Sequence, residues 1–262
     1  MPPDTETRLE SARTASTEEL KSLIHEPEED VLLALLENPK LDETHVALLL
    51  ERLDLPAKVL ETLGGEGKWT ASEGIRLGLA RHPRTPRRIA LALVRQLYLF
   101  DLVRLSLLPA APADIKRVAE EIIIARVPHL PVGQKLTLAR RGSSRVAGAL
   151  LAEGQPQAVK LALANAFLTE SQVLKVLAKA GVPERVVVAI ARDSKWSRQY
   201  NVRAALVRNA HTPSALVLEF LPDLALNDLK DIGALEDLAP ERRQRISEEI
   251  AKRADRREPT ND

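Results

Sequence analysis

The side chains best suited to chemistry in this sequence are arginines gathered in two short stretches. One stretch, RHPRTPRR, spans residues 81–88, and the other, LARRGSSR, spans residues 138–145. Guanidinium groups bind carboxylates and phosphates through paired hydrogen bonds. Clusters of this kind predict a surface for an acidic protein segment or for a nucleic acid. The candidate anion-binding or partner-binding residues are Arg81, Arg84, Arg87, Arg88, Arg140, Arg141 and Arg208.

The charge of the whole chain supports a basic central surface. Residues 57–214 hold 25 Lys plus Arg against 11 Asp plus Glu, a balance of +14, although the formal net charge of the chain is only +1. Two readings stay open, because basic residues at helix ends are also favoured by the helix dipole without any ligand. The anion surface requires that the guanidinium groups converge and are not already paired with carboxylates.

Other kinds of site have weaker signals. The chain has no cysteine, its five histidines lack metal-binding spacing, and no GxSxG or GK[ST] motif is present. The sequence therefore predicts no catalytic, metal or cofactor residue. A site assembled from distant residues stays open as an alternative.

A repeated segment sets the organisation of the chain. KWTASEGIRLGLARHPRTP (68–86) recurs as KWSRQYNVRAALVRNAHTP (195–213), an offset of 127 residues (195 − 68). The same register extends over blocks of about 31–126 and 158–253, which indicates an internal duplication of stacked helical units. Trp69 and Trp196 occupy matching places, and this repetition favours a packing role over base stacking.

The pattern of apolar residues predicts an all-α protein. Aromatic residues make up only 3% of the chain, and leucine, valine, isoleucine and alanine recur at helical spacing between turns rich in proline and glycine. Ser16 and Glu19 have capping-box spacing, and the Thr-Pro pairs at 85–86 and 212–213 predict threonine N-caps. We expect one α-helical array over 16–253, with an acidic disordered tail at 1–15 and another tail at 254–262. No apolar run suits a leader or a membrane span, so the expected location is cytoplasmic.

Two of the helical units resemble bacterial HEAT-like repeats of the leucine-rich repeat variant type. The shared pattern, VR.AL..N..TP, is carried by 75–86 and 202–213. The resemblance implies a right-handed α-solenoid of short helix pairs that acts as a binding scaffold. It also implies that the VR helices line the concave side. Four arginines would then point toward a groove: Arg76, Arg81, Arg203 and Arg208.

These observations lead to two functional hypotheses. The first is a non-enzymatic scaffold that binds an acidic protein segment or a nucleic acid through its basic centre, without membrane contact and with its oligomeric state left open. The second is an enzyme resembling the HEAT-like alkylpurine DNA glycosylases, which rely on groove aromatics and an acid. The chain has only two Trp, two Tyr and three Phe.

Overall fold

The computed structural model describes residues 5–255, with the backbone alone at Thr5 and Asp255, and every regular element in this range is helical. The prediction of an all-α protein is confirmed. Two short 3-10 helices, η1 (Val127–His129) and η2 (Leu221–Asp223), accompany the α-helices. The α-helices are α1 (Thr5–Thr14), α2 (Thr17–Leu23), α3 (Glu29–Leu36), α4 (Glu43–Leu49), α5 (Ala57–Gly65), α6 (Gly67–Thr70), α7 (Glu73–Arg81), α8 (Arg87–Val94), α9 (Leu99–Leu107), α10 (Ala113–Arg126), α11 (Val132–Arg141), α12 (Ser144–Glu153), α13 (Pro156–Leu163), α14 (Glu170–Leu177), α15 (Glu184–Arg192), α16 (Tyr200–Arg208), α17 (Ser214–Phe220), α18 (Leu226–Gly233) and α19 (Pro240–Asp255).

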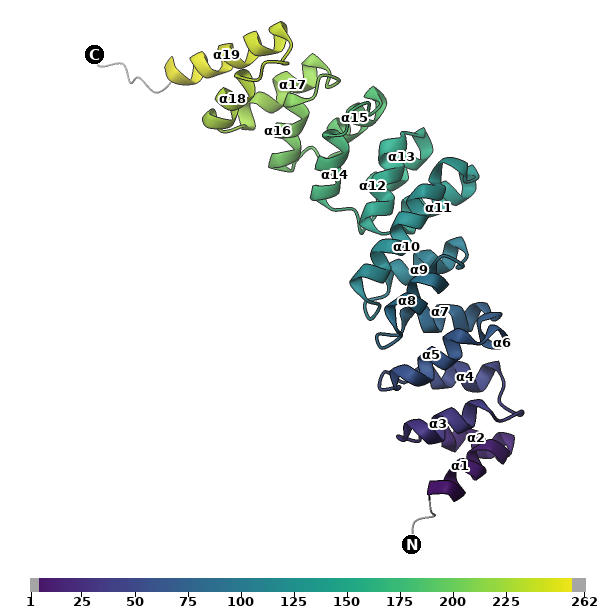
Figure 1. Cartoon of the computed structure of the whole chain (residues 1–262). Coiled ribbons are helices and arrows are strands. Elements are labelled where there is room, and N and C mark those ends of the chain that lie inside the picture. The colour runs from purple at the N-terminus through teal and green to yellow at the C-terminus, as the bar shows by residue number, and fades with distance from the viewer. Residues whose placement is uncertain (1–4, 256–262) are drawn as a thin grey trace. The chain divides into compact units, whose positions relative to one another are not determined.

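The chain divides into two compact units, Met1–Arg126 and Val127–Asp262. In the first unit, α1, α3, α5, α8 and α10 pack one on the next, and we call these helices the first row (Figure 1). Helices α2, α4, α7 and α9 form the second row, in which α7 packs on both α4 and α9. Each helix of one row is followed along the chain by a helix of the other, with only the short α6 intervening between α5 and α7.

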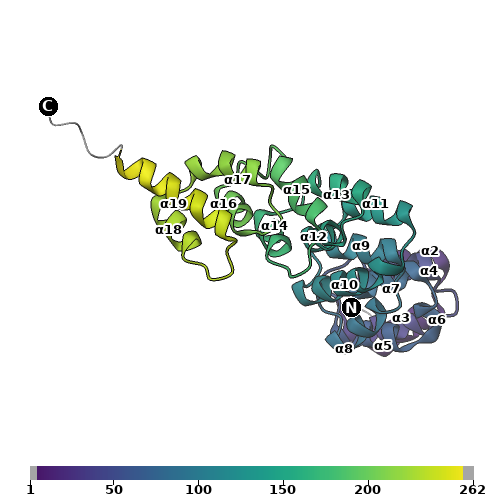
Figure 2. The same cartoon turned by 90° about the horizontal axis from the view of Figure 1, so that it is seen from above.

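The second unit has the same two-row arrangement. Helices α11, α13 and α15 pack in succession, as do α12, α14, α16 and α18. Figure 2 shows α11, α13, α15 and α17 along one side of this unit and α12, α14 and α16 along the other. We call the former the first row and the latter, with α18, the second row.

Helix starts in the second unit follow those of the first at a constant distance. Helix α3 begins at Glu29 and α13 at Pro156, a difference of 127 residues (156 − 29). The same difference separates α10, which begins at Ala113, from α19, which begins at Pro240 (240 − 113). It holds for each of the helices α11 to α19, so the register found in the sequence also governs where helices begin.

Polar side chains cap the starts of two helices, and the cap at Ser16 was predicted. Ser16 forms a complete capping box with Glu19 at the start of α2. At the start of α4, the Asp42 carboxylate accepts a hydrogen bond from the His45 backbone N–H, and this bond is the largest influence holding the pKa of Asp42 below its usual value.

Two local predictions are wrong. Residues 5–14 form helix α1 instead of a disordered tail, because Ala12 and Ala15 are buried and α1 packs on α3. The remaining tail residues, 1–4 and 256–262, lie outside the described part of the chain. The threonine N-caps are also absent: Pro86 and Pro213 occupy the N-cap positions, and the buried Thr212 hydroxyl instead donates to the Leu206 carbonyl.

The cores of both units are built mainly from aliphatic side chains with one tryptophan each, and the second unit also buries Phe220. Trp69 is 1% exposed and Trp196 is 3% exposed, so the prediction that both are core residues is confirmed. Lys68 and Lys195 each place their ammonium group over the neighbouring indole ring, at 4.2 and 4.1 Å from the ring centroid.

The two cores differ in how well their polar atoms are satisfied. In the first unit, three buried side-chain atoms have no protein partner: Trp69 Nε1, Arg76 Nε and Thr85 Oγ1. In the second unit each matching atom donates to a backbone carbonyl: Trp196 Nε1 to Leu163, Arg203 Nε to Ser197 and Thr212 Oγ1 to Leu206. The second unit has one buried side-chain atom without a protein partner, Glu153 Oε2. No helix among the described residues combines the length and the apolar character needed to cross a bilayer.

Candidate anion-binding surface

Buried asparagines align the turns that follow first-row helices. Asn38 is 1% exposed and donates from Nδ2 to the carbonyls of Ala12 at 2.9 Å and Ala15 at 3.2 Å, at the end of α1. Asn165 does the same to Ala139 at 2.8 Å and Gly142 at 3.0 Å, at the end of α11. The ends of neighbouring first-row helices therefore lie side by side, along what we call edge A of each unit.

A second set of contacts aligns the turns that follow second-row helices. Asn209, after α16, donates to the Leu177 carbonyl at the end of α14 at 3.0 Å. His82, after α7, makes the matching contact from Nε2 to the Arg52 carbonyl at 2.7 Å, while its Nδ1 accepts from the Arg84 backbone N–H at 3.2 Å. These turns form edge B. A helix of eight residues, such as α14, separates the edges by about 12 Å.

The four candidate arginines of the first unit lie together on edge B, at residues 81–88. Each has a partner from elsewhere in the unit: Arg81 pairs with Glu51, Arg84 donates to the Asp54 carbonyl at 2.7 Å, Arg87 pairs with Asp114 at 2.9 Å, and Arg88 pairs with Glu61 at 3.6 Å. This pairing counts against an anion-binding role for the cluster.

Comparison of the two units indicates that one of these ion pairs, Arg88–Glu61, is structural. Of the other two pairs, the second unit keeps one member each, as Arg208 and Glu241. In the second unit, alanine replaces Glu51 at position 178, valine replaces Glu61 at 188, and serine and alanine replace Arg87 and Arg88 at 214 and 215. Both members of the Arg88–Glu61 pair are thus absent together. Such joint loss is expected where a basic side chain serves mainly to neutralise a nearby acid.

The candidates of the second unit are divided between its edges. Arg140 and Arg141 end α11 on edge A, whereas Arg208 ends α16 on edge B. The seven residues predicted to form one surface therefore include members on opposite edges of the same unit. Among the described residues, none pairs with Arg140, Arg141 or Arg208.

Edge A of the second unit has a net positive charge. Its three turns, residues 140–146, 164–170 and 193–198, contain five Lys plus Arg and two Asp plus Glu, a balance of +3. Hydrogen bonds from Asn165 to the end of α11 and from Trp196 Nε1 to the Leu163 carbonyl at 3.0 Å place the turns in a row. Arg140, Arg141 and Arg198 are exposed and have no partner among the described residues.

The middle turn of this edge presents a phenylalanine to solvent. Phe167 is 53% exposed, and its backbone N–H donates to Asn165 Oδ1 at 2.7 Å, which fixes the turn. The sequence analysis missed Phe167, Lys195 and Arg198. The sequence holds a signal for Phe167: the matching position in the first unit is Lys40, and a lysine there indicates an exposed position.

The VR arginines are occupied by the backbone. Arg76 donates to the Thr70 and Ala71 carbonyls at 2.8 and 3.0 Å, just before its own helix. Arg203 donates to the Ser197 carbonyl and pairs with Asp223. Both guanidinium groups therefore stabilise the segment that precedes a second-row helix.

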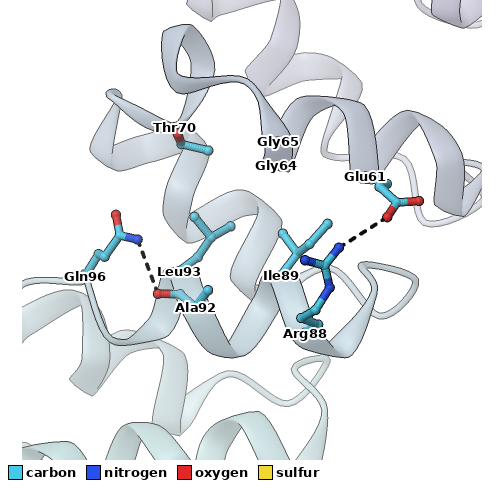
Figure 3. Close-up of a pocket in the computed structure, with 9 residues that line it drawn as sticks. All are labelled: Glu61, Gly64, Gly65, Thr70, Arg88, Ile89, Ala92, Leu93 and Gln96. Carbon is cyan, nitrogen blue, oxygen red and sulfur yellow. Dashed lines mark hydrogen bonds and ion pairs between the residues drawn. The ribbon is translucent and has the colours of Figure 1, made fainter.

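A depression of about 430 Å³ lies between α5 and α8, lined partly by Gly64, Ile89 and Thr70 (Figure 3). Its charged groups are Arg88 and Glu61, which pair with each other. The depression offers no nucleophile with a neighbouring base, and no group of three or more metal-ligating side chains occurs among the described residues.

Comparisons of the chain with protein-family models, with curated proteins and with solved structures gave no match.

Proposed function

We propose that this protein is a non-enzymatic HEAT-like α-solenoid scaffold, built from two copies of one unit, that binds an acidic protein segment through edge A of the second unit. The constant offset of helix starts and the matched bonds of Asn38 and Asn165 support the duplication. The two-row packing of each unit supports the solenoid.

The observation that carries the binding proposal is the combination of unpaired guanidinium groups and an exposed phenylalanine on one edge. The helix dipole accounts for Arg140 and Arg141, which end a helix. It does not account for Arg198, which precedes the start of α16, where positive charge is disfavoured. Protein interfaces commonly combine an aromatic anchor with surrounding arginines.

An acidic protein segment fits this edge better than a nucleic acid does. Surfaces for single-stranded nucleic acids usually stack successive bases on several aromatic rings. The three turns offer one exposed aromatic, Phe167, because Trp196 is buried, and the hydroxyl of the neighbouring Tyr200, 41% exposed, is bonded to Asp228. A peptide with carboxylates around one apolar side chain would satisfy both the guanidinium groups and the phenylalanine.

The test compares two charge-reversal variants of the full chain by fluorescence anisotropy. The probe is a labelled peptide of about twelve residues, rich in Glu and Asp with a central Leu. The edge A variant carries Arg140→Glu, Arg141→Glu and Arg198→Glu, and its matched control carries Lys175→Glu, Lys179→Glu and Arg208→Glu on edge B of the same unit. We expect the first to lose binding by at least tenfold and the control to keep it, with unchanged helical circular dichroism.

Equal loss in both variants would reject edge A as the site and leave only nonspecific attraction. Tighter binding of a single-stranded oligonucleotide of equal charge, with a log–log salt slope set by its phosphates, would support the nucleic-acid alternative instead.

A further inference from the structure

Edge A of the first unit carries the opposite charge to edge A of the second. Its turns, residues 13–19, 37–43 and 66–71, contain three Lys plus Arg and six Asp plus Glu, a balance of −3 against +3. Of these acids, Glu18, Glu43 and Glu66 are exposed and have no partner among the described residues, and each lies in a different turn.

The two edges also share one backbone geometry. Asn38 and Asn165 are equally buried, and their Nδ2 and Oδ1 atoms bond to backbone groups at matching positions along the chain. The first two turns are therefore aligned by the same bonds in both units, whereas the bond from Trp196 Nε1 that aligns the third turn of the second unit has no counterpart at Trp69. The cations of edge A in the second unit lie in its two outer turns, which match the outer turns that carry Glu18 and Glu66 in the first unit, whereas its middle turn holds Glu170 and Phe167 and no Lys or Arg.

We propose that the acidic partner of edge A in the second unit is edge A of the first unit in another copy of this chain. This inference rests on the proposed function and names its ligand. With three turns facing three turns, the middle ones meet in either direction of docking. Lys40 of one copy then meets Phe167 of the other, a cation and an exposed aromatic face that attract each other.

The consequence is self-association through unlike surfaces. Each chain carries both edges, so contacts of this kind close into a dimer or ring or continue as a chain of molecules. Because the attraction is between exposed charges, it weakens as salt shortens the screening length from about 30 Å at 0.01 M to about 3 Å at 1 M.

The test measures the mass of the full chain by light scattering at low and high salt. We expect at least twice 28.9 kDa at low salt and 28.9 kDa at high salt. The edge A variant of the second unit (Arg140→Glu, Arg141→Glu, Arg198→Glu) and a first-unit variant (Glu18→Lys, Glu43→Lys, Glu66→Lys) should each remain monomeric at low salt. An equimolar mixture of the two variants should associate, because each keeps the edge that the other has reversed.

Phe167→Lys should weaken association of the otherwise unchanged chain at least fivefold, since it sets two lysines against each other. A wild-type chain that stays monomeric at low salt would overturn the inference, as would a mixture of variants that stays monomeric. If that monomeric wild-type chain still binds the acidic peptide at edge A, the proposed function stands while the partner assigned here fails. If it binds no acidic peptide, both fail.

Discussion

Asn165 holds three backbone groups of edge A in place, and its replacement gives the most direct measure of what aligns the turns. Its side chain donates to the Ala139 and Gly142 carbonyls and accepts from the Phe167 N–H. Asn165→Ala removes three hydrogen bonds, each contributing about 1 kcal/mol net, and leaves buried polar groups without a partner. We expect a loss of about 3 to 5 kcal/mol in the free energy of unfolding of the second unit.

The order of a substitution series makes this prediction specific. Asn165→His should cost about half as much as Asn165→Ala, because a histidine, His82, makes the matching contacts on edge B with one donor and one acceptor. Aspartate should cost more than alanine, because its carboxylate would face two carbonyl oxygens. Urea unfolding followed by circular dichroism, with hydrogen exchange to separate the units, would measure the series.

Asn38→Ala is the matched control in the first unit, where the bonds have nearly the same lengths. A cost below about 1 kcal/mol for both alanine variants would refute the reasoning, as would aspartate proving milder than alanine.

Three other perturbations follow from the packing. Burial lowers the pKa of His82 and its Nδ1 accepts a hydrogen bond, so the neutral ring is favoured in the folded state. The stability that the neutral ring contributes should be lost as the pH falls below about 6.5, the pKa of an unperturbed histidine, and through the lowered pKa of the folded state. His82→Asn should flatten this part of a plot of urea midpoint against pH. Gly64→Ala should cost about 1 to 3 kcal/mol by thermal unfolding, because the new Cβ would lie 2.4 Å from Ile89 Cγ2; an unchanged melting temperature would contradict the close packing of α5 and α8. Trp196→Ala should cost about 3 to 5 kcal/mol in urea unfolding, and a cost under 1 kcal/mol would contradict its burial.

Much of the fold was accessible from the sequence because helix spacing and turn residues are local signals. Helices α7 and α16 lie within the repeated segments 68–86 and 195–213, and the burial of both tryptophans follows from their repetition. Helix α1 was missed because its own sequence is polar. Its stability comes from α3, which covers Ala12 and supplies the Asn38 bonds, and no local pattern records that contact.

The candidate surface was harder to predict, because charge counted along a segment ignores partners from other helices. Arg81 and Glu51 lie thirty residues apart in sequence, yet they pair on edge B. The count also does not reveal which row a helix belongs to, so Arg140 and Arg208 were expected on one surface and lie on opposite edges. The charge contrast between equivalent turns can be counted from the sequence once the 127-residue offset pairs them, but their place on one edge comes from the structure.

The three unpartnered polar atoms in the core of the first unit make the two units unequal in resistance to heat. Each such atom costs about 1 to 3 kcal/mol relative to a bonded one, and the second unit satisfies all three equivalents. On warming, the first unit should open before the second, which removes the acidic edge while the basic edge stays folded. An assembly joined through unlike edges would then come apart at the melting temperature of its weaker half, leaving a still-folded surface free to take other acidic chains.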